Sequence, residues 1–238
     1  MDLPQAIIFD LDDTILDDSS QVEACWQEAC RKAASAVAGL DAIALRTAIK
    51  READWYWLDP ERHREGRMDL RAASAGIVAR AMASLGLDRP GIAPQTSDHY
   101  RDLRDERLCL VEGALETIEW FRSHGVRLGM ATNGSAQGQR AKIERFGLAP
   151  YFDRIIVEGE FGIGKPNREV YEALFASLSS EPSKTWSVGD NLEWDVGVPQ
   201  SFGAYGIWVD VRRSGLPEGV PVRPDRVIQS VRELIDAR

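Results

Sequence analysis

The residues IIFDLDDT, at positions 7–14, predict a short buried strand that ends abruptly at two carboxylates and a hydroxyl. Because this strand ends at Asp10 and Asp12, both acids are expected at the carboxyl edge of a sheet, where open α/β sheets place their chemistry. Two neighbouring acids repel each other, so a cation is their natural partner, and oxygen ligands favour a hard ion such as Mg2+. A solvated, inert acidic loop is the alternative interpretation of the same residues.

Composition bounds the class of protein. The chain has 238 residues, 44% of them hydrophobic, and a net charge of −9. This length accommodates one large or two modest domains. The acidic balance argues against nucleic acid and against an anionic membrane surface as partners, and no apolar run is long enough to cross a bilayer. No basic region precedes the first strand, so a secretion signal is not expected. Oligomeric state is not specified by any feature of the sequence.

The cysteines indicate a compartment. Cys25, Cys30 and Cys109 are odd in number and show no CxxC spacing, which predicts free, buried thiols rather than disulfides or a zinc site. We therefore expect a cytoplasmic protein.

The chain after the first strand is helical in pattern for about a hundred residues. Apolar residues at helical spacing predict helices over 22–37, 42–58, 70–85 and from Pro94 to Leu108. Short connections between four helices favour a small bundle.

From Val111 onward helix and strand alternate. Strands are predicted over 126–131, 154–157, 185–188 and 205–209, with helices between them. This alternation indicates a parallel sheet with right-handed crossovers, which the first strand must join. The predicted fold is therefore an α/β, Rossmann-like core of residues 1–16 and 112–238, with a helical domain of residues 17–111 inserted after the first strand.

Three later strands also end in polar residues. They end in Thr132-Asn133-Gly134, in Gly164-Lys165-Pro166, and in Gly189-Asp190-Asn191, which Asp195 follows. Each segment alone is typical of an ordinary turn or helix N-cap. Their joint occurrence at strand ends predicts one shared site.

These four segments resemble, in order and at ordinary spacing, the four motifs of the haloacid dehalogenase-like (HAD) hydrolases, and the helical insertion resembles that family's C1 cap. The resemblance implies that Asp10 is the nucleophile, which forms an aspartyl-phosphate. It implies that Asp12 is the general acid and base. Thr132 would hydrogen-bond the phosphoryl group, with Asn133 as a further amide donor, and Lys165 would offset charge on the nucleophile and the phosphoryl group.

The resemblance also implies a Mg2+ site. Asp10, Asp190 and the backbone carbonyl of Asp12 would hold the ion, and Asp195 would bind it through water or orient Lys165. Without such cations the acids would repel an anionic substrate, whereas with them the site stabilises charge on a transferring phosphoryl group. Thr14 is expected to brace the loop.

Asp12 discriminates among the reactions of the family. Dehalogenases lack an acid at the equivalent position because a halide needs no proton. We therefore expect a Mg2+-dependent phosphatase that acts on a small phosphorylated metabolite. A phosphomutase, a 2-haloacid dehalogenase and a non-catalytic binding module on the same scaffold are the alternatives.

The insertion contains one unusual segment, residues 55–67, which holds three aromatic residues followed by three arginines and a histidine. It is interpreted as a specificity segment, with Arg64 and Arg67 as binding residues for an anionic group. The alternative is a helix end whose aromatic residues pack in the core and whose arginines are solvated.

Overall fold

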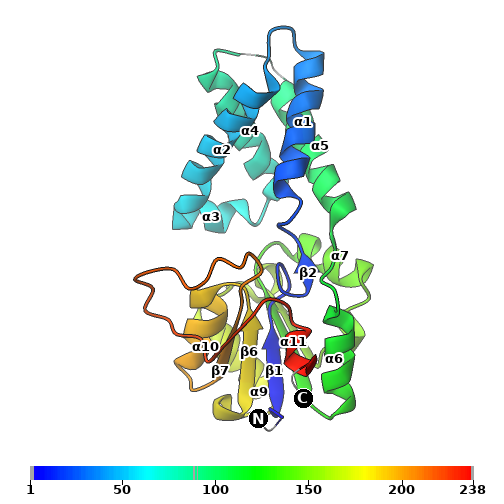
Figure 1. The fold of residues 1–238 in the computed structure, drawn as a ribbon, viewed down its shortest axis with the longest axis vertical. Coiled ribbons are helices and arrows are strands. Elements are labelled where there is room, and N and C mark those ends of the chain that lie inside the picture. The colour runs from blue at the N-terminus through cyan, green and yellow to red at the C-terminus, as the bar shows by residue number, and fades with distance from the viewer. Residues whose placement is uncertain (1–2, 88, 90, 237–238) are drawn as a thin grey trace. The chain divides into compact units, whose positions relative to one another are not determined.

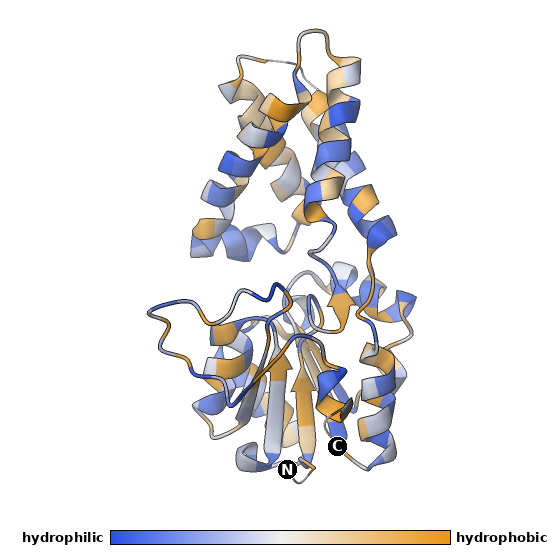
Figure 2. Cartoon of the chain, viewed as in Figure 1, coloured by the Kyte–Doolittle hydropathy of each residue, from blue (hydrophilic) through white to orange (hydrophobic). Residues whose placement is uncertain are grey.

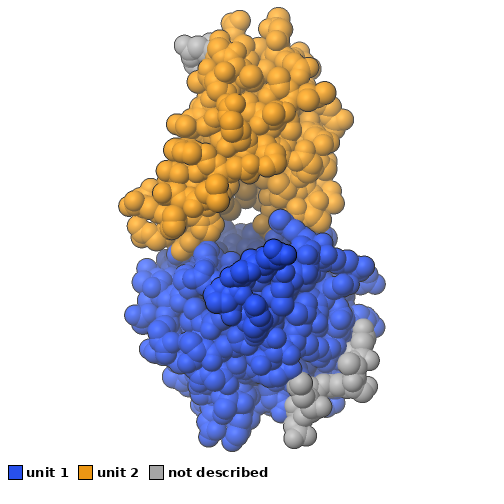
Figure 3. Space-filling model, turned by 60° about the vertical axis from the view of Figure 1, so that its left-hand side comes forward, with its two compact units in different colours: residues 1–17, 109–238 blue, residues 18–108 orange. Residues whose placement is uncertain are grey.

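A computed structural model describes residues 3–87, 89 and 91–236. The chain divides into two compact units, residues 1–17 with 109–238, and residues 18–108 (Figure 3). The division falls after Asp17 and after Leu108, whereas the sequence pattern predicted it after residues 16 and 111.

The discontinuous unit is built on a parallel sheet with strand order β5-β4-β1-β6-β7-β8 (Figure 1). The strands are β1 (Ala6–Phe9), β4 (Arg127–Thr132), β5 (Arg154–Val157), β6 (Thr185–Gly189), β7 (Tyr205–Val209) and β8 (Arg226–Ile228). The predicted α/β class is confirmed.

Register places the functional strand ends side by side. Phe9 pairs with Met130 on one side of β1 and with Val188 on the other. Asp10 therefore lies level with the last residues of β4 and β6. The chain passes from β1 to one side of the sheet and later to the other, so this edge is a topological switch point, where α/β sheets bind ligands.

Apolar contacts hold helices against both faces of the sheet. On one face Ala6 and Ile8 pack in a cluster with Leu174 of α9 (Arg168–Ser177). Elsewhere the Phe121 ring of α6 (Ala114–Ser123) lies edge-on to Trp186, with centroids 6.0 Å apart. Full burial of one such side chain contributes about 1.5–3 kcal/mol.

Further elements complete this unit. They are β2 (Leu16–Asp17) paired antiparallel with β3 (Cys109–Leu110), α7 (Ala136–Arg145), η1 (Ala149–Tyr151), α8 (Glu158–Phe161), η2 (Pro182–Lys184), the π-helical turn η3 (Leu192–Gly197), α10 (Val198–Gln200) and α11 (Glu233–Asp236). The helix expected near Asp195 is thus a π-helical turn followed by α10.

The other unit is helical. Its helices are α1 (Val22–Ala36), α2 (Ala42–Leu58), α3 (Pro60–Gly66), α4 (Leu70–Ser84) and α5 (Ile92–Arg107), which carry both hydrophobic and hydrophilic residues (Figure 2). Trp26 of α1 stacks on Tyr100 of α5 with centroids 3.6 Å apart. Cys25 and Cys30 are buried in this core.

Three local expectations were wrong: that the insertion has four helices, that the last of them begins at Pro94, and that Cys109 is buried. A separate helix α3 follows α2, because Asp59 ends one helix and caps the next, where its carboxylate accepts from the Arg62 amide at 2.9 Å and Pro60 is tolerated at the first position. Helix α5 begins at Ile92, two residues before Pro94. Pro94 is tolerated there because a proline in the first turn removes no intrahelical hydrogen bond. Cys109 is exposed on β3 rather than buried.

Among the described residues, no helix combines the length and apolar character needed to cross a membrane.

Candidate active site

Lys165 links two carboxylates at the carboxyl edge of the sheet. Its Nζ lies 2.6 Å from Oδ1 of Asp10 and 2.6 Å from Oδ1 of Asp195. All three side chains are buried. Burial lowers the pKa of Lys165, but the two carboxylates outweigh it and raise the pKa well above its usual value, so Lys165 remains an ammonium.

Asp195 is held in place by its own strand-end turn. Its Oδ2 accepts from the Asn191 amide at 3.0 Å, and its carbonyl accepts from the Ser187 hydroxyl at 2.7 Å. A Cβ on Gly189 would lie 2.4 Å from the Asp195 carboxylate. Gly189 is therefore the residue that lets this carboxylate pack directly against the end of β6.

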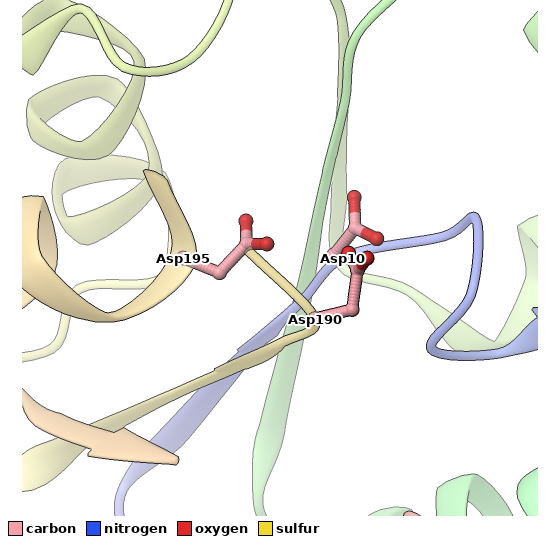
Figure 4. Close-up of side chains that lie close together, drawn as sticks. All are labelled: Asp10, Asp190 and Asp195. Carbon is pink, nitrogen blue, oxygen red and sulfur yellow. The ribbon is translucent and has the colours of Figure 1, made fainter. Parts of the chain in front are cut away.

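Asp190 completes a cluster of three acids. Oxygens of Asp10, Asp190 and Asp195 lie within 4.8 Å of one another, with Asp190 the most exposed of the three. Figure 4 shows the carboxylates of Asp10 and Asp190 close together and that of Asp195 directed toward them.

The cluster holds more negative charge than Lys165 neutralises. Burial raises the pKa of Asp10 well above its usual value; Lys165 opposes this, while Asp195 and Asp190 add to it. Burial, Asp195 and Asp13 raise the pKa of Asp190 to about 7. The ionised acids are therefore poorly compensated by the protein alone.

This donor set fits a divalent metal ion. Carboxylate oxygens are the ligands of hard cations, and two oxygens bound to one Mg2+ at about 2.1 Å are at most about 4.2 Å apart. The acidic cluster has nearly this span, and an added positive charge would offset the excess negative charge described above. The cluster can therefore hold a divalent ion.

Asp12 contacts helix α7 rather than this cluster. Its Oδ1 lies 2.7 Å from Lys142 Nζ, and its Oδ2 accepts from Gln139 Nε2 at 2.9 Å. The side chain is 28% exposed. Asp12 therefore stands beside the site with its carboxylate accessible and oriented by two donors.

Thr132 and Asn133 differ in what they can offer a ligand. The buried Thr132 hydroxyl oxygen accepts a hydrogen bond from Gln139, which leaves its own hydrogen to donate. The Asn133 side chain instead pairs with the Lys165 backbone, donating to the carbonyl at 2.7 Å and accepting from the amide at 2.8 Å. The structure thus gives Asn133 a role in holding Lys165.

Two further residues shape the loops. Glu158 is buried and accepts from the Gly134 amide at 2.9 Å, which joins the turn after β4 to the start of α8. Thr14 is fully buried, and its hydroxyl has no hydrogen-bond partner among the described residues. Thr14 therefore braces its loop by packing.

Arg64 and Arg67 belong to the helical unit. Arg64 is exposed on α3, and Arg67 ends that helix, with Nη1 at 3.4 Å from His63 Nδ1. Among the neighbouring aromatic residues, Trp55 lies between the guanidinium groups of Arg62 and Arg80, at 3.8 and 4.0 Å from its ring centroid. Trp55 is thus exposed, whereas Tyr56 and Trp57 pack against the core of the helical unit, as the structural interpretation of the segment expects.

Gln139 and Lys142 were not identified from the sequence. They lie at i and i+3 on the helix that starts directly after β4, so they share a face. Ser135, whose hydroxyl accepts from the Gly138 amide at 3.2 Å, starts that helix next to the site. The sequence feature that could have identified Gln139 and Lys142 is therefore the helical spacing of these polar residues shortly after Thr132.

The family of the chain follows from comparison with known proteins. Residues 4–203 match the family model described as a haloacid dehalogenase-like hydrolase. The chain belongs to this family of hydrolases, and the resemblance noted from its four motifs is confirmed.

Relatives in the family carry different activities in their names. The chain is 29% identical to a phosphoserine phosphatase of Thermus thermophilus over 96% of both chains. It is 27% identical to a glyceraldehyde 3-phosphate phosphatase of Methanocaldococcus jannaschii, over 84% of this chain and 82% of the relative. It is also 32% identical to an (S)-2-haloacid dehalogenase of a Pseudomonas species, over 52% of each.

Solved structures agree on the fold. The HAD hydrolase YfnB of Bacillus subtilis, solved with magnesium bound, aligns over 99% of both chains with a TM-score of 0.72 and 22% identity. At this identity the likeness supports the fold alone.

Proposed function

We propose that this chain is a Mg2+-dependent phosphatase that hydrolyses a small phosphorylated metabolite through an aspartyl-phosphate on Asp10. The observation that carries the proposal is the placement of the Asp10 carboxylate, 2.6 Å from Lys165 and within the acidic cluster, with the acid Asp12 two residues along the loop. This arrangement combines a nucleophile, a cation and a separate proton carrier.

In the first step an oxygen of Asp10 attacks phosphorus and the bond from phosphorus to the ester oxygen breaks. Asp12 gives its proton to the departing oxygen, which leaves as an alcohol. Lys165 and the Thr132 hydroxyl hydrogen-bond the phosphoryl oxygens, where charge develops during transfer. Asn133 keeps the Lys165 backbone in place.

In the second step a water molecule attacks the phosphorus of the aspartyl-phosphate. Asp12 now takes a proton from that water, and the bond from phosphorus to Asp10 breaks. Inorganic phosphate leaves, Asp10 is again a carboxylate, and Asp12 again carries its proton. One ester and one water thus give one alcohol and one phosphate.

Asp10, Asp190 and the Asp12 backbone carbonyl would hold Mg2+, and Asp195, which contacts Lys165, would either orient that lysine or bind the ion through water. When bound, Mg2+ supplies positive charge that offsets the acids and stabilises the phosphoryl group.

The acid at position 12 favours phosphate ester hydrolysis over dehalogenation. Halide departure requires no proton, so a dehalogenase does not need an acid at position 12 or the hydrogen bonds that α7 donates to it. The dehalogenase named among the relatives keeps haloacid hydrolysis as the second candidate.

The substrate class is proposed from the relatives, whose names include phosphoserine and glyceraldehyde 3-phosphate. Both are small alkyl monoesters. Arg64 and Arg67 are proposed to bind an anionic group of the substrate. If so, Arg67→Ala will lower catalytic efficiency for one substrate class, and an unchanged substrate profile would remove Arg67 from the site.

The test is phosphate release from a panel of monoesters, with Mg2+ and with EDTA, by wild type and Asp10→Asn. We expect metal-dependent release that the substitution abolishes. Chloride release from 2-chloropropionate without metal, and no release from any ester, would favour the second candidate instead.

A further inference from the structure

We propose that Gln139 and Lys142 of α7 are positioning residues that hold the Asp12 carboxyl group in place for proton transfer to the leaving group. The inference rests on the proposed phosphatase function and deepens it, because it assigns two residues outside the four sequence motifs to one step of that reaction.

Each oxygen of Asp12 has its own donor. Lys142 Nζ lies 2.7 Å from Oδ1, and Gln139 Nε2 lies 2.9 Å from Oδ2. Donors on separate oxygens fix both the direction of the side chain and the rotation of its carboxylate. Charge-assisted bonds of this length are among the stronger hydrogen bonds in proteins.

The two donors stand on a firm support. They lie three positions apart on one helix, so they face the same side. The helix is anchored by the buried Ile143 and by the Ser135 N-cap. Gln139 is itself 4% exposed, so its amide has little freedom to turn away from Asp12.

Gln139 also connects Asp12 to the phosphoryl site. Its side-chain nitrogen donates to Asp12 and to the Thr132 hydroxyl oxygen. An amide nitrogen carries two hydrogens, so one side chain serves both acceptors. The Lys142 ammonium pairs with the other Asp12 oxygen, Oδ1, so the two residues act on different atoms of the acid. The two residues should therefore have separable effects.

The leaving group provides the readout. General acid catalysis contributes about 10²–10⁴-fold to rate, and it matters most when the departing oxygen is strongly basic. An alkyl alcohol needs the proton from Asp12, whereas p-nitrophenolate departs without it. A residue that positions Asp12 therefore affects alkyl esters far more than aryl esters.

The experiment measures kcat/KM, which reports the phosphorylation step, for glycerol phosphate and p-nitrophenyl phosphate with Mg2+. For Lys142→Met we expect about a tenfold loss on the alkyl ester and less than about threefold on the aryl ester. Lys142→Arg should restore most of the alkyl activity. Arg140→Met removes a positive charge from the same helix, where Arg140 pairs with Glu160, and should behave like wild type.

Gln139→Leu supplies the second test. Because it removes the donor to Thr132 as well, it should lower kcat/KM for both esters, with the larger loss on the alkyl ester. Equal losses on both esters for Lys142→Met, no loss on either, or a gain on the alkyl ester would overturn the inference.

Failure of the inference is distinguishable from failure of the proposed function. A wild-type chain that releases no phosphate from either ester contradicts the function. An active wild type, an inactive Asp10→Asn variant and a Lys142→Met variant with wild-type leaving-group dependence contradict the positioning role alone.

Discussion

Asp190→Asn should stabilise the metal-free protein while weakening its response to Mg2+. The Asp190 carboxylate faces two other acids and a single ammonium. Asparagine has almost the same shape but no charge, so it relieves the repulsion without leaving a cavity. The Asp190 backbone carbonyl, which accepts from Trp208 Nε1 at 2.8 Å, keeps its partner in the variant.

The magnitude follows from the pKa of Asp190, which is raised from 3.8 to about 7, first by burial and then by Asp195 and Asp13. At about 1.36 kcal/mol per unit, this difference of about 3 corresponds to about 4 kcal/mol. Because Asp190 is only partly buried, solvent screens the charge, and we expect about 2 kcal/mol. For a chain of this length that is about 4–8 °C in Tm.

The sign depends on pH. The pKa of Asp190 is higher in the folded state, so the folded protein binds more protons than the unfolded chain between 3.8 and about 7. Wild-type stability therefore falls as pH rises through this window, and the full loss is present above it. Relative to wild type, Asp190→Asn should therefore gain no stability below this pH window and the full difference in unfolding free energy above it.

Thermal or urea denaturation in EDTA, at about pH 4 and about pH 8, measures this difference. Added Mg2+ should raise the stability of the wild type more than that of Asp190→Asn, since a ligand of the folded state stabilises by mass action. Asp54→Asn, which breaks an exposed pair with Lys50, is the control and should change little. A variant less stable than wild type in EDTA at the higher pH would refute the reasoning.

Two further predictions concern Gly189 and the cysteines. Gly189→Ala places a Cβ 2.4 Å from the Asp195 carboxylate, so it should lower stability by about 1–3 kcal/mol. Because displacement of Asp195 also displaces Lys165, the variant should have a lower kcat. Denaturation and phosphate release measure the two effects, and a wild-type kcat would contradict the placement of Asp195. Burial raises the pKa of Cys30 to about 11, while Cys109 is exposed, so iodoacetamide near neutral pH should modify Cys109 in the folded protein and Cys30 only after unfolding. Peptide mass spectrometry reads the order, and early modification of Cys30 would show that its site is open.

The sheet and its acidic strand ends could be predicted because both depend on local sequence. A strand ending in Asp10 and Asp12, and a second ending in Asp190, must place acids at one edge once the strands run parallel. The register of β1 with β4 and β6 brings those ends level. Pattern alone was enough for this part of the fold.

The side-chain partners could not be predicted in the same way. Which face of α7 contacts Asp12 depends on how that helix packs after β4, and so Gln139 and Lys142 were missed. Asn133 was expected to donate to the ligand, yet its amide pairs with the Lys165 backbone. Such choices are made by tertiary contacts between distant segments.

Covalent labelling of Asp10 tests the central claim most directly. The protein would be mixed with Mg2+ and a monoester carrying radioactive phosphate, quenched in acid within one turnover, and digested. The account predicts label on the peptide containing Asp10, loss of that label with hydroxylamine, and no label in Asp10→Asn. An active enzyme whose label lies on a residue other than Asp10 would contradict the account. So would an Asp10→Asn variant that is labelled as strongly as the wild type.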